Sequence, residues 1–302
     1  MTRGAYQRRS AVIPDNFTYF APATLTEAWD LLQAYPGEAK ILAGGQSLIP
    51  LMKFRLATPA YLVDLQKTPG LDTLEERDGA LVLGAMVREA RLEKTPLIQR
   101  RYPGIHDASA VVADPLVRNF ATIGGNLAHA DPANDHPAMM LALRARVVAR
   151  SPRGQREMSV DDFLVDTMET ALEPDEILIE LRVPQPAPRS GSAYVKFERK
   201  VGDYAIAAVG AQVTLDGDVC SQAGIGLTNV GPKALRATEA EAFLVGKQPT
   251  EETLREAARL AAASSEPASD LRGPEQYKRA MVRTLTVRAL RTAVQRAQAG
   301  EQ

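Results

Sequence analysis

Apolar residues recur at helical spacing near the start of the chain, every three or four positions: Ala28, Leu31, Leu32 and Tyr35. This spacing is the period of one buried helix face. Thr24 and Glu27 precede the run in the pattern of a capping box, and Pro36 and Gly37 follow it as stop signals. We therefore predict a first helix between residues 24 and 35.

The rest of the first half alternates short apolar runs with turn formers, a pattern typical of mixed helices and strands. Strands are predicted at 39–43, 61–64, 147–148 and 177–183, with a hairpin of 73–77 and 80–84 around Asp78-Gly79. Helices are predicted at 48–54, 88–93, 96–110 and 137–143, and residues 127–136 are predicted to form a loop because they are rich in turn formers.

The pattern changes beyond residue 188. Apolar and polar positions alternate there as in an antiparallel sheet, and helical patterns follow: strands at 193–197, 209–215 and 219–228, helices at 250–263 and 274–298. The segment from Pro184 to Pro188 holds three prolines, which remove donors and favour extended backbone. We place the domain boundary there, with a first domain of 1–185, divided into subdomains of about 1–60 and 61–185, and a second of 189–302.

Composition narrows the function classes. The chain has 302 residues, 45% of them hydrophobic, and a formal net charge of −1, which gives no reason to expect nucleic acid as a partner. No apolar run approaches the ~20 residues that span a bilayer, and Arg3, Arg8 and Arg9 are not followed by the apolar core of an export signal. Cys220 is the only cysteine, so this chain alone holds no disulfide and no iron–sulfur cluster. We expect a cytoplasmic protein without a transmembrane segment, soluble or peripherally attached to a membrane.

Two glycine pairs carry the main chemical signal. They lie in Ala43-Gly44-Gly45-Gln46-Ser47 and in Thr122-Ile123-Gly124-Gly125-Asn126, each after an apolar run. Glycine brings bare N–H groups close to an anion, while hydroxyl and amide side chains add donors without competing charge. Since helix starts also leave N–H groups free, two such loops before helix-like segments predict two walls around one diphosphate. A tight turn is the alternative for either loop taken alone.

The familiar nucleotide signatures do not explain these loops. Gly246-Lys247 is followed by Gln248 and not by a hydroxyl residue, so there is no Walker pattern. Gly44-Gly45 lacks the third glycine of a Rossmann fingerprint. The sequence also has no Gly-x-Ser-x-Gly elbow that would indicate a hydrolase.

A cluster of imidazoles and carboxylates follows the second loop: His129, Asp131, Asp135 and His136. These groups bind divalent cations, so a metal site is one interpretation. Loop capping by the aspartates is another, because Asp side chains hydrogen-bond nearby backbone. The third, a contact with a flavin cofactor, follows from a resemblance.

Three segments resemble the medium, FAD-binding subunit of the molybdenum hydroxylases, closest to the carbon monoxide dehydrogenase medium chain type. They are 41–53, 122–132 and 196–204, and the resemblance extends from about Ile13 to the final helix. It implies an α+β fold: a FAD-binding domain of the vanillyl-alcohol-oxidase (PCMH) type in two subdomains, and a smaller C-terminal domain with a three-stranded antiparallel sheet and helices. The flavin would lie between them.

The resemblance also implies which residues hold a non-covalent FAD. These are Ala43, Gly44, Gly45, Gln46, Ser47, Leu48, Ala121, Thr122, Gly125 and Asn126 at the two glycine loops, His129, Asp135, Ile177 and Leu178 beside the cofactor, Lys196 and Asp203, which contact FAD or shape its pocket, and Tyr204, which packs against the isoalloxazine ring. No residue of this chain is implied to be catalytic, and none to bind a metal.

The implied function is electron transfer within a complex. A large subunit with molybdenum cofactor would oxidise the substrate, a small subunit with two [2Fe-2S] clusters would relay the electrons, and this FAD would pass them to an external acceptor, within a dimer of heterotrimers. The alternatives are a standalone FAD-dependent oxidase of small molecules and a metal-dependent hydrolase that uses His129, Asp131 and His136.

Overall fold

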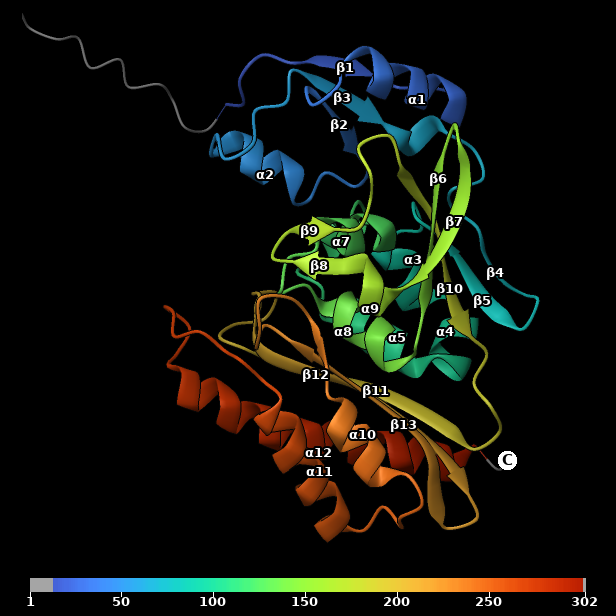
Figure 1. Ribbon diagram of the computed structural model, residues 1–302, viewed down its shortest axis with the longest axis vertical. Coiled ribbons are helices and arrows are strands. Elements are labelled where there is room, and N and C mark those ends of the chain that lie inside the picture. The colour runs from blue at the N-terminus through green and yellow to red at the C-terminus, as the bar shows by residue number, and fades with distance from the viewer. Residues whose placement is uncertain (1–12, 301–302) are drawn as a thin grey trace, which may run out of the picture.

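The computed structural model describes residues 13–300, which form three units stacked along the long axis of the molecule (Figure 1). Arg3, Arg8 and Arg9 lie outside the described residues. No helix within residues 13–300 is both long and apolar enough to cross a membrane.

The first unit is a small parallel sheet in the order β1-β3-β2, with β1 at Thr18–Phe20, β2 at Ala39–Leu42 and β3 at Tyr61–Asp64. Helix α1 (Leu25–Ala34) packs on this sheet, and α2 (Leu48–Lys53) follows β2. The Thr24 hydroxyl accepts from the Glu27 backbone N–H at 3.1 Å, which confirms the predicted cap. Because β3 is the central strand, the first unit runs at least through Asp64.

The second unit is a five-stranded antiparallel sheet in the order β4-β5-β10-β6-β7. Its strands are β4 (Leu74–Arg77), β5 (Ala80–Gly84), β6 (Arg146–Ser151), β7 (Gly154–Ser159) and β10 (Ile177–Pro184), and β8 (Leu164–Asp166) and β9 (Glu169–Thr170) form a separate pair. Its helices are α3 (Glu89–Lys94), α4 (Pro96–Arg101), α5 (Pro103–Ala110), α6 (Pro115–Arg118), α7 (Ile123–His129), α8 (Asp135–Ala142) and α9 (Val160–Phe163), and the 3-10 turn Leu65–Lys67 leads from β3 into this unit.

Two helix predictions in this unit need correction. The single helix expected at 96–110 is divided into α4 and α5, since Pro103 has no N–H to continue the ladder. The loop expected at 127–136 instead contains the end of α7 and the start of α8. The turn formers there occupy only the short break between these helices, where Ala130 takes a left-handed φ of 51°.

The third unit is a sheet in the order β11-β12-β13-β14. Three long antiparallel strands, as predicted, make up most of it: β11 (Ser190–Glu198), β12 (Ala205–Asp216) and β13 (Val219–Thr228), with the two-residue β14 (Leu235–Arg236) as a short addition. Helices α10 (Thr238–Leu244), α11 (Glu251–Ala263) and α12 (Glu275–Ala299) lie on one side of the sheet, and α5 and α8 of the second unit lie on the other (Figure 1). Both faces of the sheet are therefore buried.

Side chains also join the second and third units at the outer edge of β11. Arg296 of α12 donates to both carboxylate oxygens of Asp107 on α5, at 2.6 and 3.1 Å, and to the Ser192 carbonyl at 2.6 Å. Asp107 in turn accepts from the Tyr194 N–H at 3.2 Å. The edge strand thus has its free backbone groups paired across the junction, which keeps β11 in a fixed position beside α5.

Candidate functional site

The two glycine loops lie directly against each other. A Cβ built on Gly44 would lie 2.8 Å from the Cα of Ala121 and still closer to the carbonyl oxygen of Phe120. One built on Gly125 would lie 3.4 Å from the Cβ of Ala43. Because no side chain fits at Gly44, the backbones of the two loops approach as closely as they can. The loops are about 80 residues apart in sequence, and the fold brings them together as two walls of one cradle.

The first wall presents unused backbone donors. Among residues 13–300, no hydrogen bond is donated by the N–H groups of Gly45, Gln46 and Ser47, whereas the Ile49 N–H already bonds to the Gly45 carbonyl at 3.0 Å. Gly45 takes a φ of +73°, a conformation that other residues rarely adopt. Consecutive N–H groups around such a glycine form a concave donor set of the kind that binds phosphate oxygens.

Hydrogen bonds to Thr122 and Ala85 hold the backbone of the second wall in place. Thr122 caps α7 by accepting from the Gly125 N–H at 3.1 Å, and the Gly124 N–H bonds to the Ala85 carbonyl at 2.9 Å. The side-chain oxygen of Asn126 is buried and has no hydrogen-bond partner within residues 13–300. Such an orphaned acceptor is costly in a finished fold, so it fits a site that a polar ligand completes.

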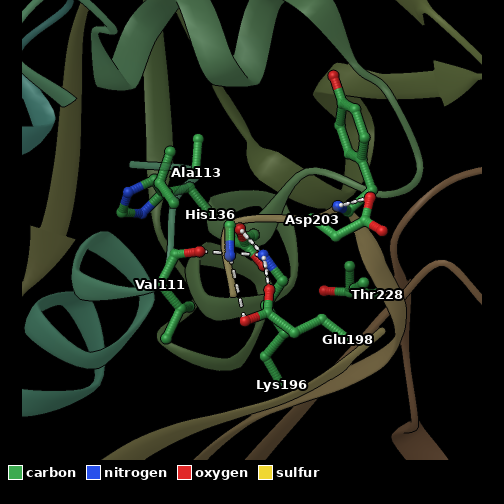
Figure 2. Close-up of polar contacts among 12 residues, drawn as sticks. Val111, Ala113, His136, Lys196, Glu198, Asp203 and Thr228 are labelled. Atoms are coloured by element: carbon green, nitrogen blue, oxygen red, sulfur yellow. Dashed lines mark hydrogen bonds and ion pairs between the residues drawn. The ribbon is translucent and has the colours of Figure 1, made fainter. Parts of the chain in front are cut away.

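Asp135 and Lys196 form a buried ion pair across the boundary between the second and third units. The Lys196 ammonium donates to Asp135 Oδ2 at 3.0 Å and to the Val111 carbonyl at 3.0 Å, and it lies 3.4 Å from a carboxylate oxygen of Glu198. Figure 2 shows the Lys196 ammonium with its contacts to these groups, and Thr228 of β13 beside them. Two N–H bonds of the ammonium thus have hydrogen-bond acceptors, and the Glu198 carboxylate adds an ion pair, so Lys196 shapes the wall of the site through Asp135.

Tyr194 completes this polar cluster. Its hydroxyl donates to Asp135 Oδ1 at 2.8 Å and lies 3.0 Å from the Thr228 hydroxyl. Burial raises the pKa of Asp135, while Lys196 and Tyr194 act in the opposite direction. Burial and the Asp135 charge raise the pKa of Tyr194 well above its ordinary value, so the phenol stays protonated.

His136 points away from the other members of its predicted cluster. It is fully buried, with Nε2 at 2.6 Å from Glu89 and 3.3 Å from the Ser109 hydroxyl, whereas His129 lies 4.0 Å from Asp131. No group of three or more His, Cys, Asp or Glu side chains in the described part of the chain could hold a metal ion. The interpretation as a metal-dependent hydrolase is therefore wrong, since the first turn of α8 directs Asp135 and His136 into the protein interior.

Asp203, which Figure 2 labels, and Tyr204 lie between β11 and β12, and the Tyr204 N–H donates to Asp203 Oδ1 at 2.9 Å. Arg272 lies 3.4 Å from Asp203 and stacks over the Tyr204 ring, with its guanidinium carbon 5.7 Å from the ring centroid. Tyr204 is 44% exposed. Burial and the charge of Asp131 raise the pKa of its phenol, which puts Tyr204 within electrostatic reach of the α7–α8 turn. An aromatic face is thus exposed beside the residues that follow the second glycine loop.

The remaining predicted residues hold different positions. His129 is partly buried at the end of α7, and burial lowers its pKa. Ile177 and Leu178 at the start of β10 bury their side chains in the cores of the first and second units. Leu48 opens α2 directly after the first loop.

Sequence reasoning missed the partners that hold these side chains. Tyr194 and Glu198 lie two residues before and after Lys196 on β11, so all three share one face of the strand. That alternation was visible in the sequence. Nothing local pointed to Val111 and Phe120, because both contribute backbone carbonyls.

The comparisons with known proteins agree with this geometry. Residues 15–186 match the model of the FAD binding domain in molybdopterin dehydrogenase, and residues 192–293 match that of the CO dehydrogenase flavoprotein C-terminal domain. The chain belongs to the molybdopterin dehydrogenase flavoprotein family.

Relatives in this family match over nearly their whole length. The carbon monoxide dehydrogenase medium chain of Hydrogenophaga pseudoflava is 43% identical, over 93% of this chain and 98% of its own. The 6-hydroxypseudooxynicotine dehydrogenase complex subunit alpha of Paenarthrobacter nicotinovorans is 38% identical, over 94% and 96%. A solved structure of the Hydrogenophaga pseudoflava carbon monoxide dehydrogenase, in a form lacking the Mo-pyranopterin moiety, superposes with a TM-score of 0.92 at 45% identity, over 94% of this chain and 99% of that one.

Proposed function

We propose that this chain is the FAD-carrying electron-transfer subunit of a molybdenum hydroxylase complex, of the carbon monoxide dehydrogenase type. The observation that carries the proposal is the contact of the two glycine loops, which leaves three consecutive N–H groups at Gly45, Gln46 and Ser47 without acceptors in residues 13–300. A diphosphate fits this donor set. Hydrogen bonds to a charged group contribute about 1.5–3 kcal/mol each, so several of them hold FAD without a covalent link.

The other site residues are proposed to orient the flavin ring. Tyr204 offers an exposed aromatic face, and Asp203 fixes the segment before it by accepting from the Tyr204 N–H at 2.9 Å. Lys196 and Asp135 hold β11 against α8 behind that face. When bound, FAD supplies the redox chemistry, and the protein supplies position and electrostatics. We assign no catalytic residue to this chain.

The partners follow from the same resemblance. We propose a large subunit with molybdenum cofactor, a small subunit with two [2Fe-2S] clusters that delivers electrons, and an external acceptor that receives them, in a cytoplasmic dimer of heterotrimers. Relatives at 43% and 38% identity are named for different substrates, carbon monoxide and 6-hydroxypseudooxynicotine. That difference is expected if substrate choice resides in the large subunit and this chain only transfers electrons.

The domain limits are part of the proposal. We assign a FAD-binding domain to residues 1–185 and a C-terminal domain to 189–302. The segment between β10 and β11 supports this division, since it lies between the last strand of one sheet and the first strand of the next.

Purification of the full chain tests the function directly. We expect a yellow protein with one FAD per chain, released intact by denaturation, that oxidises neither carbon monoxide nor aldehydes alone. Its flavin absorbance should bleach when a reduced iron–sulfur partner is added. A colourless protein after incubation with FAD would contradict the proposal. Substrate turnover by the chain alone would instead favour a standalone oxidase.

A further inference from the structure

A second cavity lies at the junction of the second and third units, at the far end of β11 from the site described above. Its volume is about 610 Å³, within the range of small-molecule pockets. Ser190 and Ser192 line it, and Ser190 lies six residues before Lys196, which is roughly 20 Å along an extended strand. The cavity is therefore separate from the proposed flavin site.

The lining of this junction cavity is strongly basic. Arg100 and Arg101 of α4, His106 of α5, Arg144 after α8 and Arg296 of α12 all contribute. None of the described residues that line the cavity is Asp or Glu. Four arginines from three different parts of the chain thus line one space, and Gln212 lines it with them.

The carboxylates that pair with Arg296 and Arg144 do not line the cavity, and they occupy only some of the N–H donors of each guanidinium group. Arg296 donates through Nη1 and Nη2 to Asp107 and through Nη1 to the Ser192 carbonyl. Arg144 donates only through Nη2, to the Ala223 carbonyl and to Glu241. Arginine has five N–H donors, so each keeps donors for a ligand. Carboxylates outside the cavity hold the arginines in place, which lowers the entropy that a ligand must overcome.

Arg101 and Arg100 show the same excess of donors. Arg101 pairs through Nη1 with Glu76, which lies outside the cavity. Arg100 has no hydrogen-bond or ion-pair partner among residues 13–300. Its charge is uncompensated at the edge of a space already surrounded by cations. An anion with more than one charge would relieve this repulsion.

We propose that the junction cavity binds a small phosphorylated anion. Guanidinium groups match phosphate oxygens in paired, planar hydrogen bonds, and several of them around one space favour a diphosphate over a single carboxylate. The volume accommodates either inorganic pyrophosphate or a nucleoside diphosphate. Because α4, α8 and α12 belong to two units, the bound anion would bridge them and raise the melting temperature.

Calorimetric titration of the full, FAD-loaded chain at about 0.15 M salt tests this proposal. Inorganic pyrophosphate and ADP are the probes, and the flavin keeps the diphosphate cradle occupied. We expect saturable binding of pyrophosphate that weakens at least about tenfold in the double variant Arg100→Gln/Arg101→Gln. Both residues are exposed on α4, so the fold should survive their replacement. ADP binding much more tightly than pyrophosphate would identify a nucleotide as the ligand, and equal affinities would identify the phosphate groups alone.

Arg283→Gln/Arg288→Gln is the matched control, since it removes the same charge from exposed positions of α12 that do not line the cavity. Binding to this control should equal that of the unmodified chain. The proposal is overturned if neither probe binds saturably at about millimolar concentration, or if the two double variants bind pyrophosphate with the same affinity.

Discussion

Gly44 lies against Phe120 with no space for a side chain between them: a Cβ built on Gly44 would be 2.8 Å from the Phe120 carbonyl carbon. Backbone cannot move aside as a flexible side chain can. Gly44→Ala should therefore separate the two glycine loops and weaken FAD binding at least about tenfold, which corresponds to about 1.4 kcal/mol. Fluorescence titration of the FAD-free protein measures this. An unchanged dissociation constant would show that the contact between the loops is not needed for the cofactor.

Gly45 offers a test with an internal control. Its φ is +73° and a Cβ there would lie 2.8 Å from Ile49 Cδ1, whereas Gly37 has nearly the same φ, +76°, and open space around it. Alanine at either position carries the same backbone strain, about 1 kcal/mol. We expect Gly45→Ala to lose FAD on dialysis and Gly37→Ala to keep it. Flavin absorbance per chain is the measurement, and equal retention in both variants would remove Gly45 from the binding site.

Tyr204 should affect the flavin through its ring and not through its hydroxyl. The ring is 44% exposed and stacks with Arg272, while the hydroxyl has no hydrogen-bond partner within residues 13–300. We expect Tyr204→Ala to shift the flavin absorption bands and the reduction potential, and Tyr204→Phe to leave both close to those of the unmodified protein. Spectroelectrochemical titration separates the two variants. Identical spectra for all three proteins would place Tyr204 away from the isoalloxazine ring.

The buried pair of Asp135 and Lys196 should show strong coupling. Loss of one partner leaves an uncompensated charge in the interior, which costs about 3–5 kcal/mol in free energy of unfolding. Asp135→Asn and Lys196→Met should each destabilise the protein by about that amount. The double variant should cost much less than the sum, because neither charge is then left alone. Urea unfolding of the four proteins measures the coupling, and additive losses would contradict it.

Local patterns were enough to predict much of this fold. The capping box at Thr24, the strand at 61–64 and the hairpin turn at Asp78-Gly79 all depend on neighbours in sequence, and the structure has each of them. The two glycine loops were also visible, because two glycine pairs with hydroxyl and amide residues, each before a helix-like segment, indicate more together than either does alone.

What the sequence could not provide was the environment of each charged side chain. His136 and Asp135 are adjacent in sequence, yet one bonds to Glu89 on α3 and the other to Lys196 on β11. A metal cluster was a fair interpretation of their spacing, and only the tertiary contacts of α8 exclude it. The junction cavity likewise depends on Arg100, Arg144 and Arg296, which no sequence spacing connects.

The His136–Glu89 pair should make stability depend on pH. Burial alone would lower the pKa of His136, but the charges of Glu89 and Asp135 outweigh it and raise that pKa above the ordinary 6.5. A group with a raised folded pKa contributes stability that is fully present below pH 6.5 and is lost as the pH rises through the folded pKa. The free energy of unfolding should therefore fall as the pH rises from 6.5.

Glu89→Gln removes the main charge that raises the pKa of His136, so the fall should become shallower in that variant. His106→Gln, which changes a partly buried histidine whose Nδ1 lies 3.0 Å from a backbone carbonyl, should keep the full dependence. Urea unfolding across this pH range compares the three proteins, and the same slope in all of them would exclude the buried pair as its source.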